Sequence, residues 1–189
     1  MKKLVSFALA IAMLICGTVS AFASDYSTYA EVAFVNDTAE RFSETIGVPV
    51  NVTDYQIVED DDFKIYSVLV QPVESARSGN TVVGYGLHTW KDKDTDTVIG
   101  EIYATAHFEY NGSSATVVKY YPQAGSMNEN SSYVIKSESH KNSTAFTKAY
   151  YKFTYSFKYF NTSKTATVEV NCTKDGVLSE NYDFKYITT

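Results

Sequence analysis

The chain has 189 residues, 44% hydrophobic and 15% aromatic, with a formal net charge of −6 at pH 7. A net acidic chain lacks the basic surface that nucleic acids and anionic membranes attract, so both are disfavoured as partners. This length suits a single globular domain.

The N-terminus has the parts of a bacterial secretory signal peptide. Two lysines open the chain, residues 4–16 form an apolar run, and Ala21-Phe22-Ala23 is a small-x-small cleavage site. We expect cleavage after Ala23, which leaves residues 24–189 as one secreted domain with a charge of 14 − 22 = −8. A retained membrane anchor is the alternative, but the apolar run is short for a span. No second apolar run follows that would predict a transmembrane helix, so we expect the product to be released or to be held by non-covalent contacts.

The two cysteines have different expected fates. Cys16 follows Ile15, where lipoprotein processing needs a small residue, so no lipobox is expected. Cys172 alone remains after cleavage, and the mature protein therefore has no internal disulfide. Cys172 alternates with Val168 and Val170, which predicts a buried thiol with a raised pKa rather than a nucleophile.

Residues 29–46 predict one amphipathic helix, because apolar side chains recur there at three- and four-residue steps. Thr28 and Glu31 fit a capping box at its start. Gly47 supplies a left-handed C-cap, and Pro49 prevents continuation. With one apolar face, this helix is expected to lie on a sheet.

After Pro49 the apolar period changes to two, which is typical of strands. Asn111-Gly112 and Asp175-Gly176 predict two-residue hairpins of type I′, in which both residues have positive φ. Strands are expected at 50–58, 63–70, 81–90, 98–110, 115–121, 133–139, 144–160, 165–173 and 178–187.

The segment 147–160 is the expected centre of the core. Its odd positions carry aromatic rings, including Tyr155 and Phe157, and its even positions are mostly polar. Burying each ring removes about 150–250 Å² from water, an upper bound of roughly 4–6 kcal/mol per ring. We therefore expect a mainly β fold, an antiparallel β-sandwich or open barrel with the helix of residues 29–46 packed on it.

Two short segments carry a resemblance. Phe108–Ser114 (FEYNGSS), followed by a β-branched run, and Cys172–Gly176 (CTKDG) resemble uncharacterised small secreted β-rich proteins of Gram-positive bacteria. The similarity covers about residues 100–179. It implies secretion and a β fold, and it brings no activity or catalytic residues.

No nucleophile, base and orienting group form a recognisable catalytic set. His88, His107 and His140 are scattered without metal-type spacing, and no G-x-S-x-G elbow occurs. His107 is expected on a solvated strand face. We therefore name no catalytic residue and expect no cofactor.

Asp92, Asp94 and Asp96 alternate as at the start of a calcium loop. Thr97 stands where that loop needs Gly, and Tyr103 stands where a bidentate Glu closes the site. A plain charged turn is therefore favoured over a calcium site.

The candidate binding residues are aromatic. Trp90 shares a strand face with Gly84 and Gly86, whose bare backbone admits a helix, a neighbouring ring or a ligand. Tyr120 and Tyr121 are adjacent, so one of them points outward unless a bulge intervenes. An exposed Tyr or Trp suits sugar or peptide binding.

The favoured function is a non-catalytic secreted or cell-surface domain that binds a protein or a glycan. A secreted hydrolase with a dispersed acid/base site is one alternative, and a raised carboxyl pKa in a cleft would support it. A bacteriocin- or toxin-like protein is another, in which residues 144–173 form a membrane hairpin.

Overall fold

The structure, a computed structural model, describes residues 29–73, 80–144 and 146–181. The expected signal peptide, residues 1–23, and the expected capping residue Thr28 lie outside the described residues. No helix in the described part of the chain is both long and apolar enough to cross a membrane.

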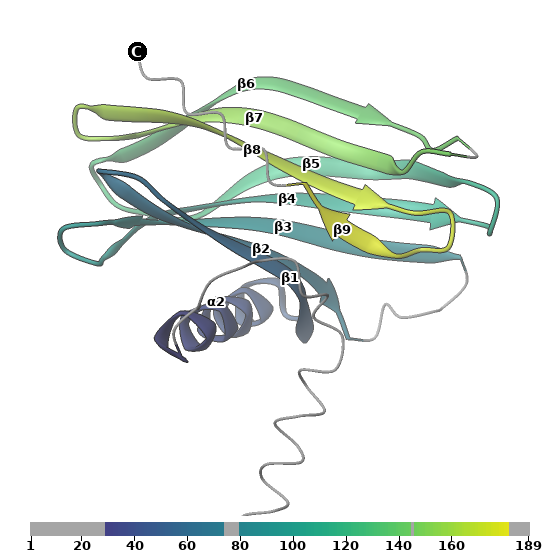
Figure 1. The fold of residues 1–189 in the computed structure, drawn as a ribbon, viewed down its shortest axis with the longest axis horizontal. Coiled ribbons are helices and arrows are strands. Elements are labelled where there is room, and N and C mark those ends of the chain that lie inside the picture. Colours follow the sequence, from purple (N-terminus) through teal and green to yellow (C-terminus); the bar gives the residue numbers. More distant parts are fainter. Residues whose placement is uncertain (1–28, 74–79, 145, 182–189) are drawn as a thin grey trace, which may run out of the picture.

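The described chain is one helix followed by nine strands (Figure 1). These elements are α2 (Tyr29–Ile46), β1 (Val50–Glu59), β2 (Phe63–Pro72), β3 (Thr81–Asp92), β4 (Val98–Tyr110), β5 (Ala115–Met127), β6 (Ser131–Lys141), β7 (Ala149–Tyr159), β8 (Thr162–Cys172) and β9 (Leu178–Glu180).

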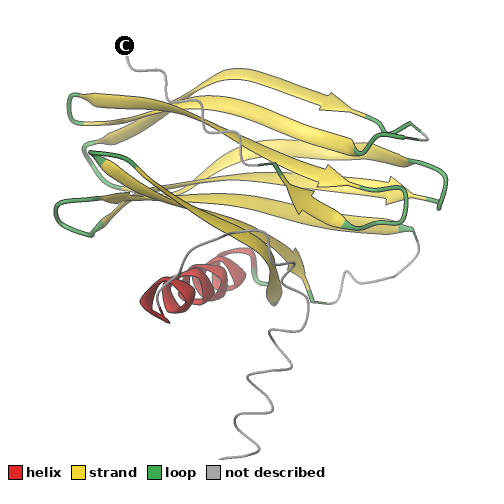
Figure 2. Cartoon of the chain, viewed as in Figure 1, coloured by secondary structure: helices red, strands yellow, loops and turns green. Residues whose placement is uncertain are grey.

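The strands form two antiparallel sheets in sequence order. Strands β1 to β5 make sheet A, and β6 to β9 make sheet B. The sheets lie face to face, and α2 packs on the outer face of sheet A (Figure 1). Figure 2 shows this single helix against the stacked strands. Of the two expected architectures, the sandwich is therefore the one observed, with the helix at the expected residues.

Sheet A separates two apolar cores. The larger core lies between the sheets and contains Trp90, Phe108 and the aromatic side chains of β7. The smaller core lies between α2 and the outer face of sheet A, where Val35, Ala39 and Phe42 meet the sheet. Sheet A is therefore covered on both faces, and its strand β2 is buried along almost its whole length.

Strand β7 confirms the expected alternation. Tyr151, Phe153, Tyr155 and Phe157 have no exposed surface, whereas Lys158 is exposed. The strand begins at Ala149 rather than at residue 144. The Thr144 and Thr147 hydroxyls hydrogen-bond each other at 2.9 Å, and the Thr147 hydroxyl also accepts from the Thr144 N–H, so this segment turns before the strand.

Gly84 and Gly86 let the sheets approach closely. A Cβ at Gly84 would lie 2.8 Å from a Val170 methyl, and one at Gly86 would lie 2.6 Å from a Val168 methyl. Both glycines face sheet B, so strand β8, rather than the helix or a ring, fills the space beside them.

The two expected type I′ hairpins are wrong. Within these two turns, only the glycines have positive φ, +80° at Gly112 and +79° at Gly176, whereas Asn111 and Asp175 do not. In the first turn the Asn111 side chain accepts hydrogen bonds from the Ser113 and Ser114 N–H groups, both 2.9 Å. This side-chain bonding stabilises a longer connection, from Tyr110 to Ala115, in place of a two-residue turn.

Several element ends differ from the expected ones. Strand β5 continues to Met127, six residues beyond the expected end at 121, because β4 pairs with it through Gly100. Strand β9 spans residues 178–180, and residues 182–187 of the expected strand lie outside the described residues.

At the start of α2, Glu31 forms an ion pair with Lys64 of β2 at 2.6 Å, which ties the first helical turn to the sheet.

Candidate functional site

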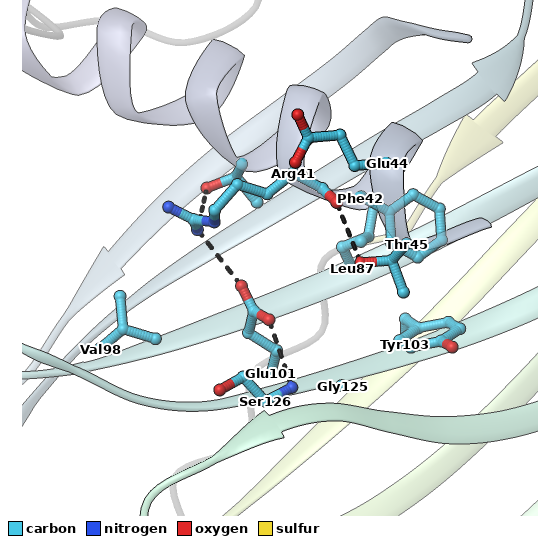
Figure 3. A pocket seen from close by; sticks show the side chains of 11 residues that line it. Arg41, Phe42, Glu44, Thr45, Leu87, Val98, Glu101, Tyr103, Gly125 and Ser126 are labelled. Atoms are coloured by element: carbon cyan, nitrogen blue, oxygen red, sulfur yellow. Dashed lines mark hydrogen bonds and ion pairs between the residues drawn. The ribbon is translucent and has the colours of Figure 1, made fainter. Parts of the chain in front are cut away.

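A pocket of about 640 Å³ lies between α2 and the outer face of sheet A (Figure 3). The C-terminal half of α2 forms one wall, β3 and β4 form the floor, and β5 forms the other wall. We call it the α2 pocket. Its lining residues are Thr38, Arg41, Phe42, Glu44, Thr45, Leu87, Val98, Glu101, Tyr103, Gly125 and Ser126.

The position of α2 creates this pocket. The apolar stripe of the helix packs mainly over β1 and β2, and the helix reaches Tyr103 of β4 through Phe42. Phe42 anchors the helix, since its ring packs edge-on against Tyr85 at 5.1 Å and Tyr103 at 5.0 Å. Such aromatic pairs contribute about 0.5–1.5 kcal/mol each beyond their buried area, so they stabilise the position of the helix on the sheet.

A chain of polar contacts crosses the pocket. The Arg41 guanidinium forms ion pairs with Asp37 and with Glu101, and its Nη2 lies 3.2 Å from Glu101 Oε1. The second Glu101 oxygen accepts from the Ser126 N–H at 3.4 Å (Figure 3). A partly exposed ion pair stabilises the fold little. The same pair nevertheless holds a fork of donors and a pair of acceptors in fixed positions at the pocket.

Beside the α2 pocket, three tyrosines surround one threonine. Strand register places Tyr85, Thr105 and Tyr121 in one row across β3, β4 and β5, on the outer face of sheet A. Tyr103, two residues before Thr105, shares this face and also lines the α2 pocket. We call these four residues the tyrosine cup.

The cup presents neutral hydrogen-bonding groups. Burial, followed by the proximity of Tyr121, raises the pKa of both Tyr85 and Tyr103. Their phenols therefore stay protonated and neutral at pH 7. Burial and the nearby Lys119 lower the pKa of His107, two residues beyond Thr105, so its imidazole is neutral at pH 7.

Thr105 is the unusual member of the cup. Its side chain is 1% exposed, and its Oγ1 has no hydrogen-bond partner in the described part of the chain. A buried hydroxyl without a partner costs about 1–3 kcal/mol. Most buried polar groups in proteins are paired, so this hydroxyl needs an explanation.

The structure separates the three aromatic residues that the sequence singled out. Trp90 is fully buried between the sheets, where its Nε1 donates to the Tyr155 hydroxyl at 2.8 Å and its ring stacks on Phe157. Tyr120 turns inward and packs on Tyr151 at 4.7 Å. Tyr121 points outward and belongs to the tyrosine cup.

Asp92 is the last residue of β3, and Asp94 and Asp96 lie in the turn between β3 and β4. Asp92 accepts hydrogen bonds from the N–H and hydroxyl of Thr95, both 2.8 Å, and Asp96 pairs with Lys91 at 2.6 Å. Within residues 29–73, 80–144 and 146–181, no three His, Cys, Asp or Glu side chains come together as metal ligands.

A second polar cluster lies between the sheets. The Tyr155 hydroxyl contacts His88 Nδ1 at 2.8 Å, and Ser67 donates to Glu180 at 2.9 Å, with His88 Nε2 3.7 Å from the same carboxylate oxygen. Burial raises the pKa of Glu180, with His88 and Ser67 acting in the opposite direction. This carboxyl faces sheet A from the side opposite the α2 pocket, so it does not line that pocket.

No local sequence pattern points to Arg41, Glu101 or Thr105. Arg41 and Glu101 are 60 positions apart and meet only because α2 crosses sheet A. Thr105 is an ordinary strand residue in sequence. The cup could have been found only from the register of β3, β4 and β5, which brings Tyr85 and Tyr121 beside it.

No protein-family model, curated protein or solved structure matches this chain.

Proposed function

We propose that this protein is a non-catalytic secreted domain of bacterial origin that binds an extracellular protein or glycan at the α2 pocket and the adjoining tyrosine cup. The observation that carries the proposal is the α2 pocket, because its walls combine apolar surface with fixed polar groups. Ligand sites are concavities of this kind, with a few convergent polar groups on largely preformed walls.

Export is the second part of this proposal. Cleavage after Ala23 would remove the apolar N-terminal run and release residues 24–189. The resemblance of residues 100–179 to secreted Gram-positive proteins supports the same compartment. The test is N-terminal sequencing of the protein from the medium of a Gram-positive expression host, where Ser24 is expected as the first residue.

The geometry favours binding over hydrolysis. Both Glu101 oxygens are already engaged, one by Arg41 and the other by the Ser126 N–H, so this carboxylate is held in place at the pocket. Glu180 has the raised pKa expected of an acid catalyst, but it is buried between the sheets. Acid/base catalysis needs such a group within reach of the substrate.

Blocking the pocket tests the binding function. Ser126→Trp fills the pocket from the β5 wall while leaving the backbone N–H that Glu101 uses. Ser139→Trp makes the same change at an exposed position of β6, remote from the pocket. Purified protein of each kind is immobilised, and the extracellular fraction of the source cells is passed over it.

We expect wild type and Ser139→Trp to retain the same component, and Ser126→Trp to retain none. Equal retention by all three proteins, or retention by none, would contradict the proposed site. Recovery of the bound component in shortened form would instead support the hydrolase alternative.

A further inference from the structure

The α2 pocket carries more negative than positive charge. Among its lining residues, all of them described, Arg41 is the only cation, and it is shared between Glu101 and the neighbouring Asp37. Glu44 adds an exposed carboxylate on the helix wall, and none of the ion pairs in the described part of the chain involves it. One positive and three negative side chains leave a net charge of 1 − 3 = −2. Such a surface attracts cations.

Other lysines on this side of the sheet do not cancel that charge. Lys91 lies on the outer face of sheet A, but its ammonium pairs with Asp96 at 2.6 Å. Lys119 lies opposite His107, six residues along β4 from Glu101, which is about 20 Å at roughly 3.3 Å per residue. Charges are screened over about 8 Å at physiological ionic strength. The pocket therefore keeps its negative potential.

The position of Glu44 is unfavourable for the helix itself. It lies in the last turn of α2, which has no basic residue, and the negative end of the helix dipole disfavours an acid there. Glu40 precedes it by four residues, so the two carboxylates repel each other on one helix face. A side chain that lowers the stability of its own helix indicates a requirement outside the helix. A ligand cation would meet that requirement.

Glu101 offers a second acceptor on the strand floor, across the pocket from Glu44 (Figure 3). Its side chain is 25% exposed and has about four acceptor sites, of which Arg41 and the Ser126 N–H use two. Gly125 is exposed beside it, and a Cβ there would lie 3.2 Å from Glu101 Oε2. The φ of Gly125 is not positive, so the backbone does not require glycine. Its missing side chain leaves space at that oxygen for an incoming group.

The apolar part of the pocket favours a polypeptide over a sugar chain. Phe42 and Tyr103 pack edge-on against each other and are only 6% and 7% exposed. Neither ring therefore presents an open face on which a sugar could stack. Leu87 and Val98 also line the pocket. Aliphatic surface of this kind packs against aliphatic side chains and against the methylene stems of lysine and arginine.

We propose that the α2 pocket binds a basic, aliphatic segment of an extracellular polypeptide, whose lysine or arginine contacts Glu44 and Glu101. This inference rests on the proposed function, and it names the ligand class. The secreted domain as a whole has a charge of 14 − 22 = −8, which steers the same kind of partner toward the pocket.

Two charge reversals of equal size separate the site from the net charge. Glu44→Lys reverses the charge at the pocket. It also places a cation four residues after Glu40 in the last helical turn, so its melting temperature should equal or exceed that of wild type. Glu138→Lys makes the same change of charge at an exposed position of β6, in sheet B. A loss of binding confined to Glu44→Lys is therefore due to the pocket and not to unfolding.

The probes are end-capped hexapeptides of alternating leucine and lysine, leucine and glutamate, or glycine and lysine, with the hexamer of β1,4-linked glucosamine as a cationic glycan. Each is titrated calorimetrically into the secreted protein in about 0.1 M NaCl, and we expect the leucine–lysine peptide to bind most tightly. Glu44→Lys should weaken its binding about five- to thirtyfold, and Glu138→Lys should bind like wild type. Salt at about 1 M, where the screening length falls from about 10 Å to 3 Å, should weaken wild-type binding.

Absence of binding by the leucine–lysine peptide overturns the inference, as does equal affinity of Glu44→Lys and Glu138→Lys for it. Tighter binding of the leucine–glutamate peptide also overturns it, and tighter binding of the glucosamine hexamer assigns the pocket to a cationic glycan instead. If no peptide binds but Ser126→Trp still loses the component that Ser139→Trp retains, the proposed function stands and this inference alone fails. If nothing is retained and no peptide binds, both fail.

Discussion

Removal of the phenol hydroxyl should have different effects on stability at two tyrosines on the same face of β7. Tyr151 and Tyr155 are both fully buried. The Tyr155 hydroxyl accepts from the Trp90 N–H at 2.8 Å and contacts His88 Nδ1 at 2.8 Å. The Tyr151 hydroxyl has no partner in the described part of the chain. The Tyr→Phe change at each position therefore isolates hydrogen bonding from ring burial.

The expected magnitudes follow from these contacts. Tyr155→Phe leaves the buried Trp90 N–H without its acceptor, which costs about 1–3 kcal/mol, and removes the His88 contact, worth about 0.5–1.5 kcal/mol. The sum is about 1.5–4.5 kcal/mol, which lowers the melting temperature by roughly 3–18 °C for a domain of this size. Tyr151→Phe removes an unpaired group and should change stability by less than about 0.5 kcal/mol, or increase it.

Urea unfolding of both variants at pH 7, followed by tryptophan fluorescence and circular dichroism, measures the two free energies. Burial raises the pKa of both tyrosines, so both hydroxyls stay protonated in this assay. Equal destabilisation of the two variants would show that ring packing, not the polar cluster, sets the effect. A larger loss in Tyr151→Phe would refute the hydrogen-bond assignment.

Other predictions follow from burial and charge. Phe157→Ala should cost about 3–5 kcal/mol and Lys158→Ala less than about 0.5 kcal/mol in thermal melts, and equal effects would contradict the alternation of β7. Burial raises the pKa of the Cys172 thiol to about 12, so a thiol reagent at pH 8 should label it only after unfolding. Burial raises the pKa of Glu180 in the folded state above its value in the unfolded chain, which is about 4.3. The contribution of this carboxyl to folding stability is therefore fully present below that pH and is lost as the pH rises. The Glu180→Gln variant should therefore have a higher melting temperature than wild type at pH 8 and the same melting temperature at pH 4. A higher melting temperature of wild type at pH 8 would mean that the pairing of Glu180 with His88 outweighs the cost of its burial. Calcium should leave the melting temperature unchanged, and a rise that is lost in Asp94→Ala would reveal a metal site.

Local patterns predicted the elements well. The three- and four-residue apolar steps and Gly47 placed α2 at its observed bounds, because helix termini depend on nearby side chains. The alternation in β7 predicted its buried face for a similar reason, since successive strand side chains point to opposite faces. Cys172 was placed in the core by the same alternation.

Turn geometry was less predictable. Asn111-Gly112 fits a type I′ hairpin in sequence, but the Asn111 side chain bonds to two following N–H groups instead. The tight two-residue connection occurs at Phe160-Asn161, where Phe160 has a φ of +49°. The pairing of β7 with β8 requires this conformation, which overrides the preference of a bulky residue for negative φ.

The sequence by itself determined which segments form the helix and the strands, because those depend on residues within a few positions of one another. Only the tertiary structure decided which side chains from distant segments meet. Trp90 looked like a binding residue beside two glycines, yet strand β8 covers that face and buries the ring. Arg41 meets Glu101, and Thr105 lies among tyrosines of three strands, through helix placement and strand register. These arrangements depend on contacts between distant segments, which no local periodicity encodes.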